Sequence, residues 1–282
     1  MQHLVLVGAC YLDTILSVPH YPEQDSKLRA TSLAIRRGGN CPNTLEVLEQ
    51  LLDAHHHRDN VQAHLVSPLP ERSSPATRRI VASFGPRSRA DLDHCLYRDA
   101  CSEPASSYII RSEATGSRTI VNYNLLPEMT AREFEGVVRA FVSHPDSWWH
   151  FEGRIPDTTL ACIRLLRSHL PAARISVELE KPGRQGLPEL AAEADVVFYS
   201  RSWAESRGHQ SAEACLTGEQ RRQSTVGAGD TFIAGMLYGL VCREKTWHLS
   251  QSVRFAVDLA TLKVQREGFQ GLGADMVAPA TG

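Results

Sequence analysis

The sequence has no apolar run of membrane-spanning length, and residues 1–8 lack the basic segment and cleavage site of a signal peptide. Its seven cysteines are scattered without a C-x-x-C pair, which favours reduced thiols over a disulfide framework or a zinc site. A net charge of −2 provides no basic footprint for nucleic acid. We therefore expect a cytoplasmic protein that binds neither a membrane nor nucleic acid.

The order of the predicted elements indicates an α/β fold. A composition of 42% hydrophobic and 22% charged residues is typical of a globular chain with a sizeable core. In the second half, strand and helix patterns alternate at residues 148–153, 158–170, 175–180, 194–199, 228–242 and 249–265. This alternation predicts a parallel sheet with helices on both faces.

A glycine turn that opens an apolar helix is the most informative motif. It spans residues 225–232 and contains Gly227, Ala228, Gly229 and Asp230. Free amides at a helix N-terminus favour phosphate, and a carboxylate beside them could accept a proton from an attacking hydroxyl. The motif indicates phosphoryl transfer, although alone it equally fits an ordinary turn with Asp230 as the helix cap.

Polar residues after other predicted strands and turns are further candidates. Asp13 ends an N-terminal strand, and Asn40 and Asn43 lie at the Gly38-Gly39 turn before a helix predicted over 43–52. Taken singly, these residues fit turns and caps, but ligands of open α/β sheets bind beyond the carboxyl ends of the strands. The asparagine side chains, which both donate and accept, suit a polyhydroxylated ligand.

Charged residues form two more groups. Arg118 is grouped with Glu152 and Arg154, although it also fits an exposed ion pair. Glu178 and Glu180 could help to hold Mg²⁺ through water or could be solvated charges at a strand end. The sequence does not identify the metal ligands.

A run of three histidines, at positions 55–57, offers nitrogen donors but no neighbouring carboxylate cluster. Consecutive residues cannot all face one ion, so we expect a solvated loop rather than a metal site.

Two motifs together carry a resemblance to a known family. They are Gly-Gly-Asn-x-x-Asn at residues 38–43 and Thr-Val-Gly-Ala-Gly-Asp-Thr-Phe at residues 225–232. Supporting pieces in the family's order include Val-Gly-Ala-Cys-Tyr-Leu-Asp, Ser-Arg-Thr-Ile-Val, His-Phe-Glu-Gly-Arg, Ser-Val-Glu-Leu-Glu-Lys-Pro and Gln-Ser-Ala-Glu-Ala. The chain resembles the ribokinase-type (PfkB) carbohydrate kinases, and among them the ketohexokinases (fructokinases).

The resemblance implies one ribokinase-like domain over residues 1–282, with a mainly parallel central sheet flanked by helices. It also implies a small β-sheet lid, with strands near 28–37 and 106–123, through which such proteins often form homodimers. ATP would be the co-substrate and Mg²⁺ the metal.

The resemblance also assigns roles to residues. Asp230 matches the catalytic base, and Gly227, Ala228 and Gly229 match the anion hole. Asp13, Gly39, Asn40 and Asn43 match sugar-binding positions. Arg118 matches a residue near the nucleotide phosphates.

The chain departs from the family pattern before residue 225. The family has a helix, a sheet strand, a turn, a hairpin and a further strand where this chain has only residues 217–224, which are polar and predict a loop. A central strand and a hairpin are therefore expected to be missing. The family's Asn-x-x-Glu magnesium motif is not recognisable near residues 200–205, where Glu205 is a weak substitute.

Three functional hypotheses follow. The first is ATP-dependent phosphorylation of a sugar hydroxyl, on a ketohexose such as fructose. The second is another ribokinase-type kinase acting on a different sugar or a nucleoside. The third is a catalytically impaired pseudokinase or a truncated isoform, because the missing segment would supply much of the nucleotide-binding wall.

Overall fold

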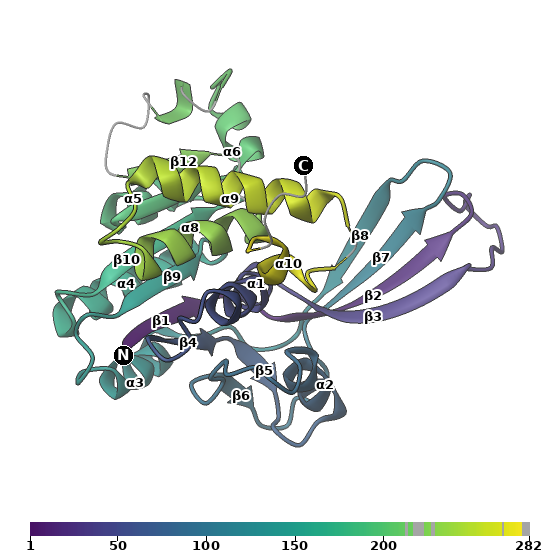
Figure 1. Ribbon diagram of the computed structural model, residues 1–282. Coiled ribbons are helices and arrows are strands. Elements are labelled where there is room, and N and C mark those ends of the chain that lie inside the picture. Colours follow the sequence, from purple (N-terminus) through teal and green to yellow (C-terminus); the bar gives the residue numbers. More distant parts are fainter. Residues whose placement is uncertain (212–213, 217–222, 227–228, 267, 278–282) are drawn as a thin grey trace.

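A six-stranded sheet, entirely parallel, forms the centre of the molecule (Figure 1). The computed structural model describes residues 1–211, 214–216, 223–226, 229–266 and 268–277. The strand order is β12-β11-β10-β9-β1-β4. The strands are β1 (Gln2–Val7), β4 (Val61–Val66), β9 (Trp148–Glu152), β10 (Arg174–Leu179), β11 (Val196–Tyr199) and β12 (Gln223–Val226).

Helices cover both faces of this sheet, so almost all residues of its inner strands β1, β9, β10 and β11 are buried. Leu4 and Leu6 of β1 pack on one face, and Val5 and Val7 pack on the other. The first face is covered by α1 (Asn40–Ala54), α8 (Asp230–Cys242), α9 (Leu249–Val264) and α10 (Leu272–Asp275). The second is covered by α3 (Ala131–Ala140), α4 (Pro156–His169), α5 (Leu187–Glu193) and α6 (Arg201–Ser206).

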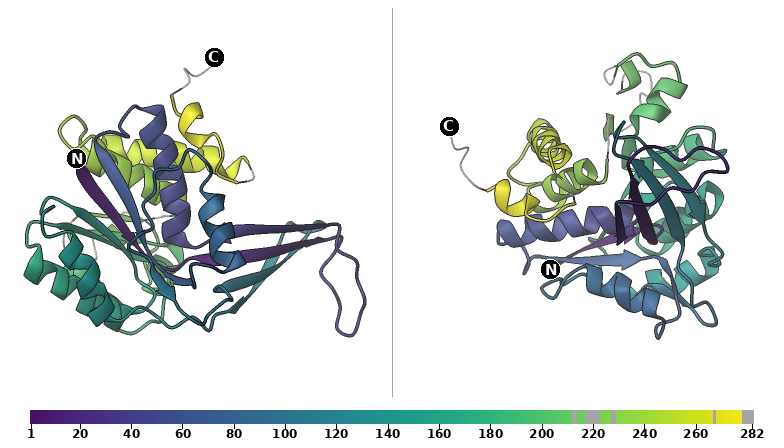
Figure 2. Two further views of the ribbon diagram at one scale, coloured as in Figure 1. Left: turned by 90° about the horizontal axis from the view of Figure 1, so that it is seen from below. Right: turned by 90° about the vertical axis from the view of Figure 1, so that its right-hand side faces the viewer.

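A second, four-stranded sheet projects from the main body at the carboxyl ends of the parallel strands (Figures 1 and 2). Its order is β3-β2-β7-β8. The strands are β2 (Tyr11–Val18), β3 (Ser32–Gly38), β7 (Ser106–Ser112) and β8 (Arg118–Tyr123). The predicted α/β architecture with a mainly parallel sheet, flanking helices and a small separate sheet is confirmed.

The connection between β4 and β7 carries additional short elements at the edge of the body. They are β5 (Pro68–Pro70), α2 (Pro75–Ser83) and β6 (Leu96–Arg98), and β5 pairs with β6. Ser74 caps α2 by accepting a hydrogen bond from the amide of Thr77 over 3.0 Å. None of the helices among the described residues is long and apolar enough to cross a bilayer.

The segment before the glycine turn differs in part from its expectation. Gln223 and Ser224 were expected in a loop, but they begin β12, which pairs in parallel with β11. Residues 217–222 lie outside the described part of the chain. The described residues between α6 and β12 contain no other strand. The backbone of β12 therefore provides the hydrogen-bond partners for the edge of β11 that faces away from β10.

The prediction of a solvated histidine loop is also corrected. His55 and His57 are partly buried, because their rings stack on Tyr238 of α8 at centroid distances of 5.1 and 5.7 Å. Only His56 of the three is exposed. The histidines therefore pack the end of α1 against α8.

Candidate active site

Carboxylates gather where neighbouring strands of the central sheet end. Glu152 is the last residue of β9, and its register partner on β10 is Glu178. Both side chains are buried, and Glu180 follows directly after β10. Asp230 begins α8 at the same edge, because the parallel strands all point their carboxyl ends that way.

The N-terminus of α1 meets this acidic edge through two asparagines. Asn43 Nδ2 donates to Oδ2 of Asp230 over 2.8 Å, and Asn40 Nδ2 donates to Oε2 of Glu178 over 3.0 Å. The hydroxyl of Thr44 donates to the backbone oxygen of Asp230 over 3.2 Å. The structure thus brings together two sequence motifs that are almost 190 residues apart.

A glycine turn at Gly39 allows the start of α1 to lie close to the loop after β1 and to the acidic edge. Gly39 caps α1 with a φ of 105°, a left-handed conformation that favours glycine. A Cβ atom there would lie 2.2 Å from the backbone oxygen of Ala9, so any side chain would push α1 away from the loop after β1.

Burial alters the acidity of these carboxyl groups. Burial, assisted by the negative charges of Glu180 and Glu152, raises the pKa of Asp230 to about 7, although the hydrogen bond from Asn43 opposes the rise. Burial and the charge of Asp230 raise the pKa of Glu178 well above its ordinary value. Burial also raises the pKa of Glu152, whose Oε2 accepts from the amide of Ala9 over 2.9 Å. Asp230 therefore titrates close to neutral pH.

A buried arginine holds the second asparagine in place. Arg37 of β3 donates from Nη1 to Oδ1 of Asn43 over 3.2 Å, from Nη2 to Glu46, and from Nε to Ser83 over 3.0 Å. Its guanidinium also lies over the ring of Phe84, 4.3 Å from the centroid. With Oδ1 of Asn43 occupied by Arg37, the amide nitrogen is directed at Asp230.

A pocket of about 430 Å³ opens between the acidic edge and the small sheet. Its volume is in the range of small-molecule sites. The residues that line it are Tyr11, Asp13, Gly39, Asn40, Ser107, Ile120, Asn122, Glu152, Arg154, Glu180, Lys181 and Arg184. The pocket is therefore lined by candidate site residues from three places in the chain: β2, the start of α1, and the ends of β9 and β10.

Asp13 contributes a buried acceptor to this pocket. Its Oδ1 has no hydrogen-bond partner among the described residues. Burial raises the pKa of Asp13, while a hydrogen bond with Ser107 and the charges of Arg36 and Arg118 partly offset this rise. A buried acceptor without a donor is costly, so a donor on a bound molecule would stabilise it.

Other predicted site residues lie elsewhere. Arg118 is exposed at the start of β8 and does not line the pocket, but it shares the sheet face of Asp13 and Asn122 by the register. Glu205 is exposed and accepts from Nε of Arg201 over 2.6 Å. Gly227 and Ala228 lie outside the described residues, and Gly229 is the residue before α8.

Several pocket residues were not among the predicted site residues. Ser107 and Asn122 are register partners, and Asn122 Nδ2 donates to Ser107 Oγ over 3.0 Å. Both positions lie within residues 106–123, which the resemblance assigns to lid strands, so the sequence contained part of that signal. Tyr11, Lys181 and Arg184 carried no comparable signal, because only the folded chain brings β2 and the end of β10 together.

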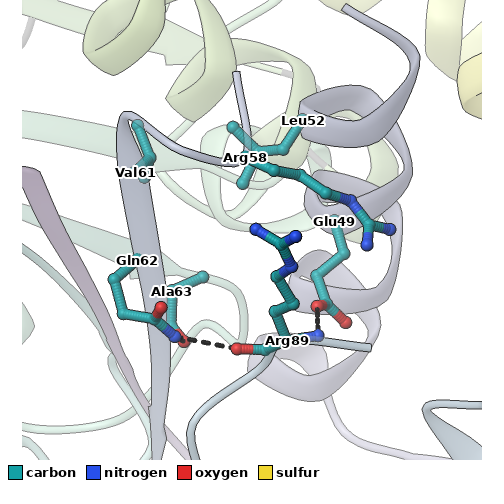
Figure 3. Close-up of a pocket in the computed structure, with 7 residues that line it drawn as sticks. All are labelled: Glu49, Leu52, Arg58, Val61, Gln62, Ala63 and Arg89. Atoms are coloured by element: carbon teal, nitrogen blue, oxygen red, sulfur yellow. Dashed lines mark hydrogen bonds between the residues drawn. The ribbon is translucent and has the colours of Figure 1, made fainter. Parts of the chain in front are cut away.

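A separate cavity between α1 and β4 is too small for a substrate (Figure 3). Its volume is about 10 Å³, roughly one water molecule. Glu49 Oε1 accepts from the amide of Arg89 over 2.6 Å, and Gln62 Nε2 donates to the oxygen of Arg89 over 2.8 Å (Figure 3). These bonds tie the segment around Arg89 to the body.

Several solved structures share the fold of this chain. A ribokinase from Arabidopsis thaliana, complexed with ribose and ATP, superposes with a TM-score of 0.72 at 14% identity and covers 99% of this chain and 100% of that one. A carbohydrate kinase from Agrobacterium tumefaciens superposes with a TM-score of 0.75 at 14% identity over 98% and 95% of the two chains. At these identities the likeness establishes the ribokinase fold.

Comparisons of the amino-acid sequence identify a matching protein family and a similar protein of known activity. Residues 202–274 match the pfkB family carbohydrate kinases. The chain is 29% identical to mouse (Mus musculus) ketohexokinase over 315 aligned positions, which cover 96% of this chain and 99% of that protein. The predicted resemblance to ribokinase-type (PfkB) carbohydrate kinases, and to ketohexokinase among them, is confirmed.

Proposed function

We propose that this chain is an ATP-dependent kinase that phosphorylates a hydroxyl group of a sugar. The family match and the kinase relatives support an ATP-dependent carbohydrate kinase. The observation that carries the proposal is the bond between Asn43 and Asp230, which joins the proposed sugar motif to the proposed base beside the pocket. As the substrate we propose a ketohexose such as fructose, by analogy with the mouse relative.

In this proposal Asp230 is the general base. Its carboxylate takes the proton of the attacking hydroxyl, which must lie within hydrogen-bond distance. Phosphoryl transfer depends on in-line placement and charge neutralisation, and a base with a pKa of about 7 is well matched to neutral pH. Gly227, Ala228 and Gly229 are proposed to supply amides for the transferring phosphoryl group, and Arg118 to approach the nucleotide phosphates from the small sheet.

The sugar is proposed to bind in the 430 Å³ pocket. Asp13 Oδ1 is a buried acceptor without a partner among the described residues, and a sugar hydroxyl is the matching donor. Asn40 and Asn122 add amide groups to the pocket wall, while Gly39 leaves room beside it. Asn43, which does not line the pocket, would act through its bond to Asp230.

The residues at this edge fit Mg²⁺. Burial and the negative charges of neighbouring carboxylates raise the pKa of Glu152, Glu178 and Asp230, and a divalent cation would relieve that repulsion. Hard oxygen donors are the ligands that Mg²⁺ accepts, with water and substrate phosphates completing its shell. Bound there, Mg²⁺ would neutralise charge on the phosphates. Of the four carboxylates at this edge, Glu152 and Glu180 line the pocket and would hold the ion there.

The small sheet is proposed to act as a lid and as a homodimer contact. Its face opposite Asp13 exposes Leu33, Tyr108, Val121 and Tyr123, with exposed fractions of 62%, 53%, 61% and 51%. Such an apolar patch on one face of an extended sheet suits a second copy of this chain. A cytoplasmic location is likewise a proposal, supported by the seven free cysteines.

A coupled assay of ADP release with fructose, ribose and adenosine tests the activity and the substrate class. Turnover with fructose supports the ketohexokinase-like activity, and a preference for ribose or adenosine supports another ribokinase-type kinase. Sugar binding without turnover would establish the pseudokinase. Sequencing the transcript tests the remaining alternative. If it contains coding sequence for the missing family strands between Gln220 and Thr225, this chain is a truncated isoform.

A further inference from the structure

Four histidines and an aspartate gather beside β1 and β4, and none of them lines the sugar pocket. His3 of β1 and His64 of β4 are buried. Asp91 and His94 come from the connection between α2 and β6, and both are partly buried. His144 follows α3, and its ring lies 4.0 Å from that of His3.

Three of these side chains converge on one point. His64, Asp91 and His94 each offer a ligand atom, and these atoms lie within 4.8 Å of one another. Asp91 Oδ2 and His64 Nδ1 are 3.0 Å apart. Donors around a tetrahedral ion at about 2.1 Å lie about 3.4 Å apart, so small side-chain rotations suffice to enclose an ion.

Neighbouring groups orient two of the donor atoms. Asp91 Oδ1 accepts from the amide of Asp93 over 2.7 Å, which leaves Oδ2 to face His64. The backbone of Asp91 bonds to Ala63 and Leu65 of β4 on either side of His64, over 2.9 and 2.8 Å. This bridge holds Asp91 against the strand.

The ring of His64 is oriented in the same way. Its Nε2 lies 2.9 Å from Nδ1 of His3, which occupies one ring nitrogen. Its Nδ1 is buried and lies 3.0 Å from Oδ2 of Asp91, with no other partner among the described residues. A ligating histidine whose other ring nitrogen is hydrogen-bonded is the usual arrangement at metal sites.

We propose that His64, Asp91 and His94 bind a zinc-type divalent transition-metal ion, with water as the fourth ligand. Two imidazoles and one carboxylate suit Zn²⁺, whereas Mg²⁺ and Ca²⁺ prefer oxygen donors alone. The bound ion ties the loop carrying Asp91 and His94 to the edge strand of the central sheet. This site is independent of the proposed kinase activity.

Titration of the untagged, EDTA-treated protein with Co²⁺ tests the site, because Co²⁺ in a zinc site absorbs visible light. We expect one equivalent to bind, and Zn²⁺ to displace it. His94→Ala and Asp91→Ala are expected to weaken Co²⁺ binding at least about a hundredfold, which corresponds to two powers of ten in the dissociation constant. His56→Ala, which removes an exposed histidine, is the matched control and should bind Co²⁺ normally.

Thermal unfolding provides a second readout that does not require kinase turnover. Zn²⁺ should raise the Tm of the natural chain and of His56→Ala, because a ligand that binds the folded state stabilises it. It should leave the Tm of His94→Gln unchanged, a variant that keeps a polar side chain in the same turn. Absence of one-to-one Co²⁺ binding, or equal binding by His94→Ala and the natural chain, would overturn the site.

Discussion

Asn43 Nδ2 donates a hydrogen bond to Asp230 Oδ2 over 2.8 Å, across 187 residues of sequence. The same asparagine accepts from Arg37 through its Oδ1, so both ends of its amide are engaged. Asp230 is consequently held at the start of α8 beside Glu152 and Glu178, where burial raises its pKa to about 7. This pairing underlies the first two of the following predictions.

Asp230→Asn should lower kcat by about 10²–10⁴-fold, because the amide cannot accept the hydroxyl proton. Sugar binding measured by calorimetry should persist, since Asn keeps the size and an oxygen acceptor for Asn43. Asp258→Asn, on the exposed side of α9, is the control and should retain full activity. Near-normal turnover in Asp230→Asn would eliminate the proposed base.

The pH profile of the natural enzyme should report the ionisation of Asp230. Its carboxylate must be deprotonated to act as a base, and its pKa is about 7. kcat/KM should therefore fall about tenfold per pH unit well below pH 7 and level off above it. Asn43→Ala removes a hydrogen bond that lowers this pKa, so the midpoint should move to higher pH.

The matched control for that shift is Asn60→Ala, an exposed asparagine outside the site. Its profile should coincide with that of the natural enzyme. A midpoint that stays in place or moves to lower pH in Asn43→Ala would contradict the assignment of the profile to Asp230.

Gly39→Ala should impair both folding stability and sugar binding. The φ of 105° is strained for alanine, and the new Cβ would lie 2.2 Å from the backbone oxygen of Ala9. Gly85→Ala separates these effects, since Gly85 has a φ of 86° but open space around it. We expect a loss of about 1 kcal/mol for Gly85→Ala and a larger loss for Gly39→Ala, measured by urea unfolding.

Arg37→Met should reduce the free energy of unfolding by about 2 to 4 kcal/mol, because it leaves Glu46 without its cation in a largely buried place. Its neighbour Arg36 points to the other face of β3 and is exposed. Arg36→Ala should change stability by no more than about 0.5 kcal/mol. Equal urea midpoints for the two variants would show that the Arg37 cluster contributes little.

Val121→Asp should convert the proposed homodimer into monomers. The substitution places a charge in the middle of the exposed apolar face of the small sheet, where Val121 pairs with Tyr108. Val142→Asp, at a valine with an exposed fraction of 54% after α3, is the control. Light scattering after gel filtration distinguishes the masses, and a monomeric natural chain would refute dimerisation through this face.

Local patterns predicted much of the fold. The alternation of strand and helix in the second half follows from residue spacing, and the observed β9, α4, β10, β11, α8 and α9 lie where it was expected. The paired strands β7 and β8 lie within residues 106–123, where the resemblance implies lid strands. These elements depend on near neighbours, so their signals are present in the sequence.

The segment before the glycine turn could not be predicted in the same way. Gln223 and Ser224 are polar and lack a strand pattern, yet the backbone pairs with β11. The open hydrogen-bonding edge of β11 favours this pairing, and that edge exists only after the sheet has formed. The packing of His55 and His57 on Tyr238 likewise depends on where α8 lies.

The sequence by itself determined the residue types of the candidate site: two glycine turns, two asparagines, and carboxylates after buried strands. Only the tertiary structure decided that Asn43 meets Asp230, that Asn40 meets Glu178, and that His64 faces Asp91. The reason is physical. Spacing along the chain specifies local conformation, whereas contact distance, burial and the resulting pKa arise from segments that pack together from distant parts of the sequence.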